Sequence, residues 1–381
     1  MAKQTRHQEM KNILLIGGGH THVSVIRALS GKLPDTSSIT LISESRKMPY
    51  SGMLPGYIAG HYATSECHID LHNLCEKYNV RFLQQKVVTI DSAKKLISTN
   101  NGRKYEYDIA SINIGGDPNT NYLSGVKEWG LPIKPIENFL KIIEEFFEDA
   151  LTKPVTEELH VRIIGGGASS VEVVLALRYK SKKLGLDNIK FSLITDKTDI
   201  LPTHPMPVRR KFHFLLLQND IMTIYSTKVT RIEKNFIFND QNEKLDSDLS
   251  ILANGISAVS WPIESGLPSD SRGFIQTDNT LLVKGTEELF ATGDSATIES
   301  YSYPKSGVYA VKQAATLASN ICNLINSKPL HTYEPQTHSL ALISAGKKTA
   351  VASSKFFYAH GTWIWHLKNY IDKSFINKFR T

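Results

Sequence analysis

Two segments of this chain have the composition of a turn that binds a pyrophosphate. Glycines 17–19 and glycines 165–167 each follow a short apolar run and precede a helix-like segment. A glycine can adopt a positive φ and lets the backbone approach a pyrophosphate, and the N-terminus of the following helix offers free N–H groups. This order of strand, turn and helix is the context that the dinucleotide-binding fingerprint requires. Two such turns predict two bound dinucleotides with electron transfer between them.

Both copies depart from the full fingerprint at its third glycine. His22 and Ser170 stand at that position, where a glycine normally serves close packing of helix on strand rather than contact with phosphate. For one copy alone, a glycine turn in an ordinary α/β protein is the alternative, because short motifs give false positives. The duplication disfavours it. His20 and His22 lie where the first pyrophosphate is expected, which makes both candidate cofactor contacts.

The composition is typical of a globular protein of two or three domains. The chain has 381 residues, of which 41% are hydrophobic and 21% charged. Residues 1–11 are polar, so no secretory signal is expected, and no apolar run approaches the roughly 18 residues of a membrane-spanning helix. Three cysteines do not suggest a disulfide framework. We therefore expect a cytoplasmic protein in a reducing compartment.

The second half of the chain repeats the order of the first. After each glycine turn a helix-like segment leads to an apolar strand, at residues 39–42 and 191–194. Each half then reaches a further apolar strand, which ends at Gly115 in the first half and at Gly255 in the second. Alternating strands and helices indicate βαβ units with parallel sheets.

A third marker indicates that the chain returns to its first domain. Residues 289–294 form an apolar run that ends in Gly293-Asp294, and a helix-like segment follows over residues 307–325. We predict an α/β fold of two Rossmann-like dinucleotide-binding domains and a small C-terminal region. The first domain would comprise residues 1–130 and 280–335, the inserted second domain residues 131–279, and the C-terminal region residues 336–381.

In these features, the chain resembles the two-dinucleotide-binding flavoproteins of the pyridine nucleotide-disulfide oxidoreductase superfamily. The resemblance is carried by both glycine turns, by Val171-Glu172, by the two strand-ending glycines and by residues 291–294. Within the superfamily the chain resembles type II NADH dehydrogenases and sulfide:quinone reductases. Residues 17–22 and 49–56 also look like the flavoprotein module fused ahead of selenophosphate synthase (selenide, water dikinase), without its kinase portion.

The resemblance implies FAD at the first site. Gly17 and Gly19 would hold its pyrophosphate, and Asp294 would bond its ribityl chain. Glu44 would bond the adenosine ribose, although it lies one place after the usual acid, and a solvated surface acid is the alternative. The remaining contacts expected at this site are His20, His22, Pro55, Gly115 and Gly293.

The resemblance implies NADH or NADPH at the second site. Gly165 and Gly167 would approach its pyrophosphate, together with Ser170 and Gly255. Glu172 matches an acid near the nicotinamide, and a first-turn Glu favoured by the helix dipole is the alternative. Asp196 favours the 2′-hydroxyl of NADH and repels a 2′-phosphate, although its neighbour Lys197 weakens that preference.

The implied activity is that of an FAD-dependent NAD(P)H dehydrogenase that passes electrons to a quinone or another small acceptor. The cofactors carry this chemistry, so no side-chain nucleophile is needed. Gln313 matches a glutamine near the quinone in type II NADH dehydrogenases, but Val308 and Lys312 replace polar amides there. The alternative is a flavin-binding regulatory or partner module with little turnover, in selenium metabolism for example.

The cysteines and histidines indicate other chemistry only weakly. Cys67, Cys75 and Cys322 form no paired redox motif, which disfavours disulfide reduction and sulfide oxidation and leaves structural or free thiols. His68 and His72 are one helical turn apart, but no Cys, His or acid set with ligand spacing accompanies them. We therefore expect no metal.

The C-terminal segment is basic and amphipathic. Residues 341–381 contain seven Lys or Arg and one acid. Five apolar residues recur at three- or four-residue spacing, which indicates one face of a helix: Ile364, Leu367, Ile371, Phe375 and Phe379. With Trp363 and Trp365 at its start, such a helix suits a membrane surface. Packing on the protein's own body or on a dimer partner is the alternative. Nucleic acid is not expected as a partner, and the oligomeric state stays open.

Overall fold

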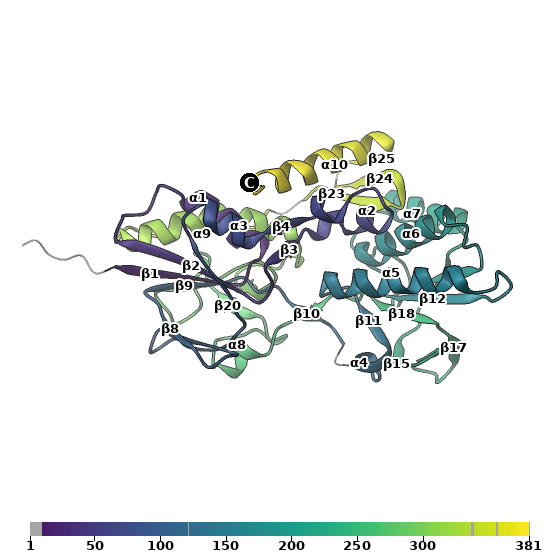
Figure 1. The fold of residues 1–381 in the computed structure, drawn as a ribbon, viewed down its shortest axis with the longest axis horizontal. Coiled ribbons are helices and arrows are strands. Elements are labelled where there is room, and N and C mark those ends of the chain that lie inside the picture. Colours follow the sequence, from purple (N-terminus) through teal and green to yellow (C-terminus); the bar gives the residue numbers. More distant parts are fainter. Residues whose placement is uncertain (1–9, 121, 337–338, 356, 381) are drawn as a thin grey trace, which may run out of the picture.

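The computed structural model describes residues 10–120, 122–336, 339–355 and 357–380. The chain forms two lobes, each built around a five-stranded parallel sheet. A C-terminal sheet and helix lie across one side of both lobes (Figure 1). This arrangement confirms the α/β class and the repeated organisation that the sequence predicts.

The first lobe contains a parallel sheet in the strand order β21-β9-β1-β2-β5. Its strands are β1 (Lys11–Ile16), β2 (Ser37–Ser43), β5 (Arg81–Gln84), β9 (Ile109–Ile112) and β21 (Leu289–Ala291). In β1, Ile13 and Leu15 pack into the core on one face of the sheet, and Leu14 and Ile16 pack into the core on the other. Residues 13–16 of β1 are all apolar because the sheet is covered on both faces.

Different elements cover the two faces of this sheet. One face carries the helices α1 (His20–Leu29), α3 (Leu71–Lys77) and α9 (Gly307–Ile325). The other carries β6 (Val87–Asp91), β7 (Leu96–Thr99), β8 (Lys104–Glu106), α8 (Trp261–Glu264), β20 (Ile275–Thr277) and β22 (Ala296–Ile298). The short 3-10 helix η3 (Gly293–Ser295) follows β21. The bounds of α9 agree with the helix expected over residues 307–325.

The second lobe repeats this plan with the strand order β11-β18-β12-β13-β14. Its strands are β11 (Gly130–Pro132), β12 (Leu159–Ile164), β13 (Ile189–Ile194), β14 (Met222–Ile224) and β18 (Leu249–Leu252). Helices cover one face: α5 (Ile136–Thr152), α6 (Ala168–Lys183) and α7 (Met206–Gln218). The other face carries α4 (Val126–Trp129), β15 (Val229–Glu233), β16 (Phe236–Asn239) and β17 (Lys244–Asp246).

Two short strands mark the crossings between the lobes. β10 (Asp117–Pro118) leads out of the first lobe, β19 (Ile256–Ser257) leads back, and the two pair antiparallel. Trp261, Leu267 and Ile275 then join the core of the first lobe. The lobe boundaries therefore differ from those expected: the inserted lobe lies between β10 and β19, and residues 258–279 pack with the first lobe rather than with residues 131–257.

A segment of the first lobe reaches toward the second. Residues 47–70 form β3 (Lys47–Pro49), η1 (Ser51–Met53), α2 (Leu54–Ile58), η2 (Thr64–Glu66) and β4 (His68–Asp70). Leu54 and Ile58 of α2 are buried in the core of the second lobe, where α2 packs against α6. The segment thus connects the cores of both lobes.

The C-terminal region also packs on both lobes. It consists of the antiparallel strands β23 (Ala341–Ala345), β24 (Lys347–Ser353) and β25 (Tyr358–Gly361), followed by α10 (Thr362–Asn377). Ile343 and Val351 lie in the core of the second lobe, whereas Ala352, Ile364 and Trp365 lie in the core of the first. The region bridges the lobes.

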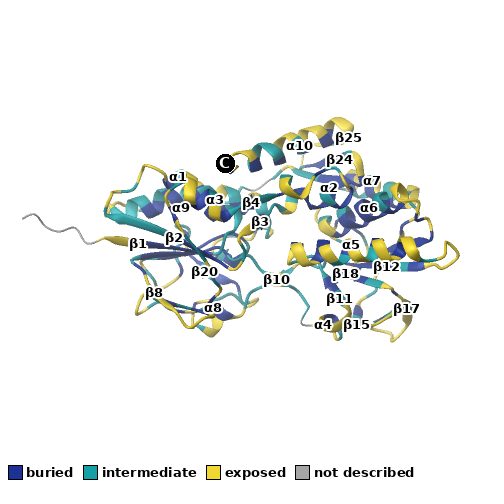
Figure 2. Cartoon of the chain, in the orientation of Figure 1, coloured by how far each residue is buried: buried dark blue, intermediate teal, exposed yellow. Residues whose placement is uncertain are grey.

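The face of α10 that packs inward agrees only in part with the one that the spacing predicts, since Ile364, Phe375 and Phe379 pack against the core of the first lobe but the other two residues do not. Its inner side buries Ile364, Trp365, Lys368, Asp372 and Ile376. Leu367 and Ile371, expected on the same face as Ile364, are exposed together with Trp363 and Tyr370. The exposed residues of α10 are yellow in Figure 2. The helix is apolar on two sides, so periodicity alone does not select the inner one.

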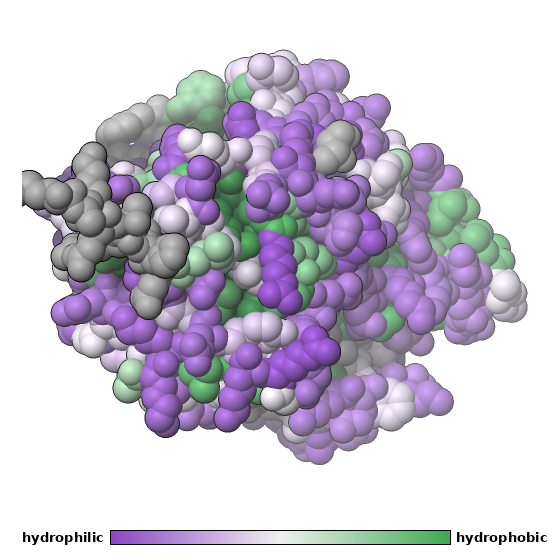
Figure 3. Space-filling view, turned by 60° about the vertical axis from the view of Figure 1, so that its left-hand side comes forward, coloured by the Kyte–Doolittle hydropathy of each residue, from purple (hydrophilic) through white to green (hydrophobic). Residues whose placement is uncertain are grey.

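The surface is largely hydrophilic. On the face drawn in Figure 3, hydrophobic residues show chiefly in a hollow near the middle and at one edge. None of the helices within the described residues combines the length and apolar character that crossing a bilayer requires.

Candidate active site

The first cavity opens where strands of the first sheet end. Its volume is about 480 Å³. β1, β2 and β9 are parallel and in register, so the residues that follow them meet at one edge of the sheet. Six of the residues expected at this site line the cavity: Gly17, Gly19, His20, Glu44, Gly115 and Asp294.

The turn after β1 is a cradle that only glycine can form. Gly17 has φ +91°, and a Cβ on it would lie 2.4 Å from the backbone oxygen of Asn113. A Cβ on Gly19 would lie 2.2 Å from Oδ1 of the Asn113 side chain. Both glycines thus pack too closely against Asn113 for a side chain, and both line the cavity, which fits a turn that approaches a pyrophosphate.

Asn113 holds this cradle together, and the sequence analysis did not single it out. Its Oδ1 accepts hydrogen bonds from the backbone N–H of Thr21 and of His22, at 3.2 and 3.4 Å. Its Nδ2 donates to the backbone oxygen of Thr292 at 3.1 Å. A polar residue directly after an otherwise apolar strand is the sequence signal that could have indicated it.

His22 lies beneath the glycine turn and is not among the residues that line the cavity. One ring nitrogen bonds the backbone oxygen of Gly17 at 2.7 Å, and the other bonds the Ser111 hydroxyl at 2.9 Å. Burial lowers the pKa of His22 to about 4, so the ring is neutral at neutral pH. The imidazole thus supports the turn from behind, at the position where the fingerprint has its third glycine.

Asp294 lies at the end of the cavity near α9. Its carboxylate is 3.8 Å from Nζ of Lys134, which also lines the cavity. Gln313 is buried behind this turn, where its Oε1 accepts a hydrogen bond from the backbone N–H of Gly293 at 2.6 Å. Its Nε2 donates to the Tyr303 hydroxyl at 3.1 Å. Gln313 therefore positions the Gly293-Asp294 turn, and neither it nor Gly293 lines the cavity.

Glu44 marks the opposite end of this cavity, after β2. Its side chain is 68% exposed and pairs with Lys86 at 3.3 Å. Pro55 is buried in α2 and does not line the cavity, whereas Pro49 and Ser51 of the same segment do. The cavity therefore has an acid at each end, with the glycine cradle between them.

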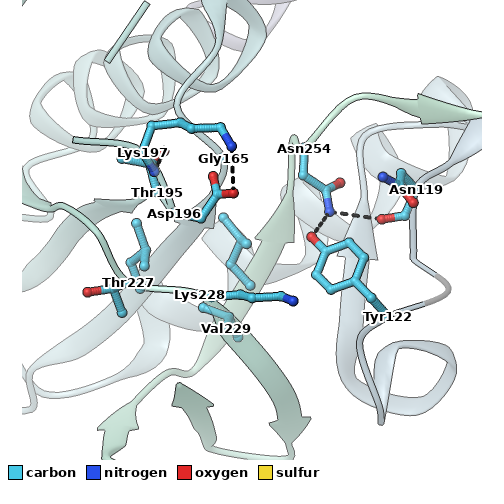
Figure 4. Close-up of a pocket in the computed structure, with 12 residues that line it drawn as sticks. Asn119, Tyr122, Gly165, Thr195, Asp196, Lys197, Thr227, Lys228, Val229 and Asn254 are labelled. Carbon is cyan, nitrogen blue, oxygen red and sulfur yellow. Dashed lines mark hydrogen bonds and ion pairs between the residues drawn. The ribbon is translucent and has the colours of Figure 1, made fainter. Parts of the chain in front are cut away.

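The second cavity lies at the corresponding edge of the second sheet and has a volume of about 460 Å³. Figure 4 shows Gly165, Asp196 and Lys197 on one side of it, and Asn254 with Tyr122 on the other. Gly165 has φ +137°, and a Cβ on it would lie 2.6 Å from the backbone oxygen of Ala253. This turn therefore also requires glycine.

The polar groups of the second cavity are held by local contacts. Asp196 pairs with Lys197 at 3.0 Å. Asn254 donates from Nδ2 to the Tyr122 hydroxyl and, at 2.9 Å, to the backbone oxygen of Asn119. Three residues expected at this site, Gly167, Ser170 and Gly255, do not line the cavity. Ser170 donates to the backbone oxygen of Ala253 at 3.0 Å, and so supports the turn as His22 does in the first lobe.

Glu172 faces the C-terminal region rather than the second cavity. Its carboxylate accepts a hydrogen bond from the backbone N–H of Ser344 in β23 at 2.7 Å. Burial raises the pKa of this carboxyl, and the charge of Lys368 opposes that shift. The structure thus brings Glu172 together with α10 and not with the glycine turn of its own helix.

The cysteines are free thiols. Cys67 and Cys75 are buried in the core of the first lobe, and burial raises the pKa of each to about 12. A thiol with such a pKa remains protonated at neutral pH, which does not suit a redox nucleophile.

The sequence profile of the pyridine nucleotide-disulphide oxidoreductase family matches residues 11–314. The chain belongs to this family. It is 25% identical over 346 residues to a type II NADH:quinone oxidoreductase of Staphylococcus haemolyticus (strain JCSC1435), with 86% of each chain covered. It is 24% identical over 349 residues to the demethylphylloquinone reductase NdbB of Synechocystis sp. (strain ATCC 27184 / PCC 6803 / Kazusa), covering 88% of this chain and 85% of the relative.

Two solved structures share the fold along almost the whole chain. NDH2 from Plasmodium falciparum in complex with NADH has a TM-score of 0.82 at 18% identity, with 97% of each chain covered. The sulfide:quinone oxidoreductase from Aquifex aeolicus has a TM-score of 0.82 at 20% identity, covering 97% of this chain and 91% of that one.

These similarities confirm several of the expectations drawn from the sequence. The two-dinucleotide fold is present, and the protein is an FAD-dependent oxidoreductase that uses a pyridine nucleotide. Two cradles that require glycine, one per lobe, are the structural counterpart of that assignment.

Proposed function

We propose that this protein oxidises NADH with FAD and passes the electrons to a quinone. The presence of two glycine cradles at the ends of two parallel sheets carries this proposal, because each fits one dinucleotide. The names of the relatives support quinone as the acceptor, since both act on quinones by their names.

Residues of the first cavity would hold FAD. Gly17 and Gly19 would receive its pyrophosphate, Glu44 its adenosine ribose and Asp294 its ribityl chain. Lys134, beside Asp294, places a positive charge at the flavin end of the cavity. When bound, the flavin accepts the hydride from the nicotinamide and supplies electrons to the acceptor.

Residues of the second cavity would hold NADH in preference to NADPH. Gly165 of this cavity and Gly167 of the same turn, which does not line the cavity, would receive the pyrophosphate, and Asp196 would accept hydrogen bonds from the adenosine ribose. A 2′-phosphate would meet the Asp196 carboxylate. Lys197 already pairs with that carboxylate, so its charge is partly compensated.

Anaerobic titration of the purified holoprotein tests this function. We expect NADH to bleach the flavin absorbance within seconds at micromolar concentrations, NADPH to do so more slowly, and a water-soluble quinone to restore the absorbance. Failure of both nucleotides to bleach the flavin would end the proposal. Bleaching by NADH without reoxidation by quinone would retain the dehydrogenase and exclude the acceptor.

The outer side of α10 supports attachment to a membrane surface. Trp363, Leu367, Tyr370 and Ile371 are 57, 37, 73 and 43% exposed and recur at helical spacing. Lys378 follows Ile371 by seven residues, on the same side of the helix, and is exposed. Exposed tryptophan, tyrosine and lysine next to an apolar stripe are typical of an interfacial helix. We infer that this side of α10 contacts a membrane surface.

Substitution of the outer residues tests the attachment without disturbing the fold. The variant Trp363→Ser/Leu367→Ser/Ile371→Ser should lose most of its flotation with anionic liposomes, because each buried apolar side chain contributes about 1.5–3 kcal/mol. Deletion of the helix is unsuitable, since Ile364, Trp365 and Ile376 belong to the core. Phe214→Ser/Leu217→Ser on α7, where both residues are also exposed, is the matched control. Equal flotation of both variants would exclude docking through α10.

A further inference from the structure

A lysine of the second lobe lies in the cavity of the first. Lys134 follows β11 and comes shortly before α5, and residues 134–137 all line the first cavity. The start of α5 accordingly faces the first lobe (Figure 1). The lobe that holds the second glycine cradle therefore places a positive charge in the cavity that would hold FAD.

The ammonium group of Lys134 can bind a further acceptor. Its carboxylate partner within the described residues is Asp294, at 3.8 Å, which is too long for a hydrogen bond. An ammonium group carries three N–H donors, and the side chain of Lys134 is 39% exposed. These donors therefore remain available to a group that enters the cavity.

Two other groups that line this cavity fit a bound ligand as well. Pro135 at the N-cap of α5 has no side-chain acceptor that could cap the first N–H groups of the helix, whose N-terminus carries a partial positive charge. Nε2 of His20 is buried and has no hydrogen-bond partner among the described residues. Because buried polar atoms nearly always have a partner, this nitrogen indicates a group bound in the cavity.

The charge of a flavin changes when the flavin is reduced. A hydride brings two electrons and one proton, so the reaction of NADH with FAD gives NAD⁺ and a reduced ring with one negative charge, which N1 and the C2 carbonyl oxygen share. A charge held away from bulk water is costly unless a group of opposite charge accompanies it. Charged groups near N1 are one means by which a protein tunes the electronics of a flavin.

We propose that the ammonium group of Lys134 stabilises the negative charge of the reduced flavin and thereby raises the reduction potential of the bound FAD. This inference rests on the proposed function, in that it takes FAD to lie in the first cavity with its ring at the Asp294 end. Lys86, another lysine of this cavity, pairs with Glu44 at the opposite end and is not placed to do so. The lobe that receives NADH thus also supplies the charge that holds its electrons.

The midpoint potential of the FAD in the purified holoprotein tests this role. It is measured by anaerobic reduction with dithionite against a reference dye, so neither NADH nor an electron acceptor is needed. Lys134→Met removes the charge and should lower the potential by about 30 mV, which is a tenfold change in the equilibrium constant of a two-electron couple. Lys134→Arg keeps the charge and should stay within about 15 mV of the wild type, a factor of about three. Lys141→Met is the matched control, because it removes the same charge from an exposed position of α5 outside the cavity.

The pH dependence of the potential separates the charge of Lys134 from a structural role. Its slope counts the protons taken up with the two electrons, which are two when the reduced ring is neutral and one when the ring is an anion. In Lys134→Met the pH at which the slope changes from two protons to one should rise by about one unit, because a tenfold less stable anion binds a proton tenfold more tightly. The other titratable groups that face Lys134 in the cavity are His20, Asp117, Glu137 and Asp294, and all four remain in the variant.

The FAD content of every variant is measured alongside the potential. Equal potentials for Lys134→Met and Lys141→Met would overturn the inference, and so would a lower potential without the change in pH dependence. Lys134→Gln replaces the Met variant if the latter does not fold, and loss of FAD from both would overturn the inference by assigning Lys134 to cofactor binding alone. If the potentials shift as expected but NADH does not bleach the wild-type flavin, the proposed function fails and this inference stands.

Discussion

Replacement of Gly165 by alanine should give a protein that keeps FAD but is reduced poorly by NADH. Gly165 has φ +137°, and its Cβ would lie 2.6 Å from the backbone oxygen of Ala253 and 2.7 Å from Oγ of Ser170. A residue with a side chain must therefore move the turn or hold a strained conformation that costs about 1–3 kcal/mol. Either change draws the backbone N–H groups away from the nucleotide.

The size of this effect is measured as the NADH concentration for half-maximal flavin bleaching. We expect that concentration to rise about a hundredfold, since each 1.4 kcal/mol corresponds to a factor of ten. Dithionite should still bleach the flavin, because the first lobe is unchanged. Gly185→Ala is the matched control: Gly185 also has a positive φ, +74°, but no atom lies within 4 Å of its Cβ position. If Gly165→Ala responds to NADH like Gly185→Ala, the second cradle does not bind the nucleotide.

Replacement of Gly17 by alanine should yield a protein that purifies without its flavin. The added Cβ would lie 2.4 Å from the backbone oxygen of Asn113 and 2.9 Å from Cγ2 of Ile114, at φ +91°. Asn113 cannot retreat, because its side chain is bonded to the start of α1 and to Thr292. The turn must open instead, and FAD affinity should fall by a factor of about a hundred or more.

Absorbance at 450 nm and thermal unfolding report this loss directly. For the wild type, added FAD at a hundred times its Kd stabilises the folded state by about 2.7 kcal/mol. The Gly17→Ala protein should show little of this increase in Tm. Gly102→Ala is the matched control. Gly102 lies in a hairpin with φ +79° and open space around its Cβ position, so this variant measures only the cost of a side chain at positive φ. A yellow Gly17→Ala protein with one FAD per chain would show that the first cradle does not hold the pyrophosphate.

The features that could be predicted from the sequence are those encoded by neighbouring residues. Apolar runs before glycine turns indicated β1 and β12, and the helix over residues 307–325 has the expected bounds, because periodicity and flanking residues are local signals. Gly17 and Gly165 of the two glycine turns each line a cavity, whereas of the two strand-ending glycines only Gly115 does.

Other features depend on partners that lie far away in the sequence. His22 supports the glycine turn because one ring nitrogen donates to the backbone oxygen of Gly17 and the other accepts from the Ser111 hydroxyl, and nothing near residue 22 indicates the contact with Ser111. Glu172 accepts a hydrogen bond from the backbone N–H of Ser344, a contact that depends on the packing of β23 on α6.

The C-terminal helix shows a third limit of local patterns. Ile364 and Leu367 fit one predicted face by spacing, yet the first is buried and the second exposed. α10 has an apolar side toward the core and another toward the exterior, and the inner side also buries the ion pair of Lys368 with Asp372. A sequence pattern treats these two charges as surface residues.

The bridging of both lobes by the C-terminal region limits how they can hinge. Besides β10 and β19, the packing of α2 on α6 joins the lobes, and that contact lies at one place. With β23 packed on α6 and α10 packed in the core of the first lobe, a swing of one lobe away from the other would have to break hydrophobic packing at one end or the other. A chain that stopped after α9 would keep both cradles and the packing of α2 on α6, but it would lose this second bridge between the lobes. The distance that an electron pair travels is thus constrained in part by a segment that belongs to neither cradle.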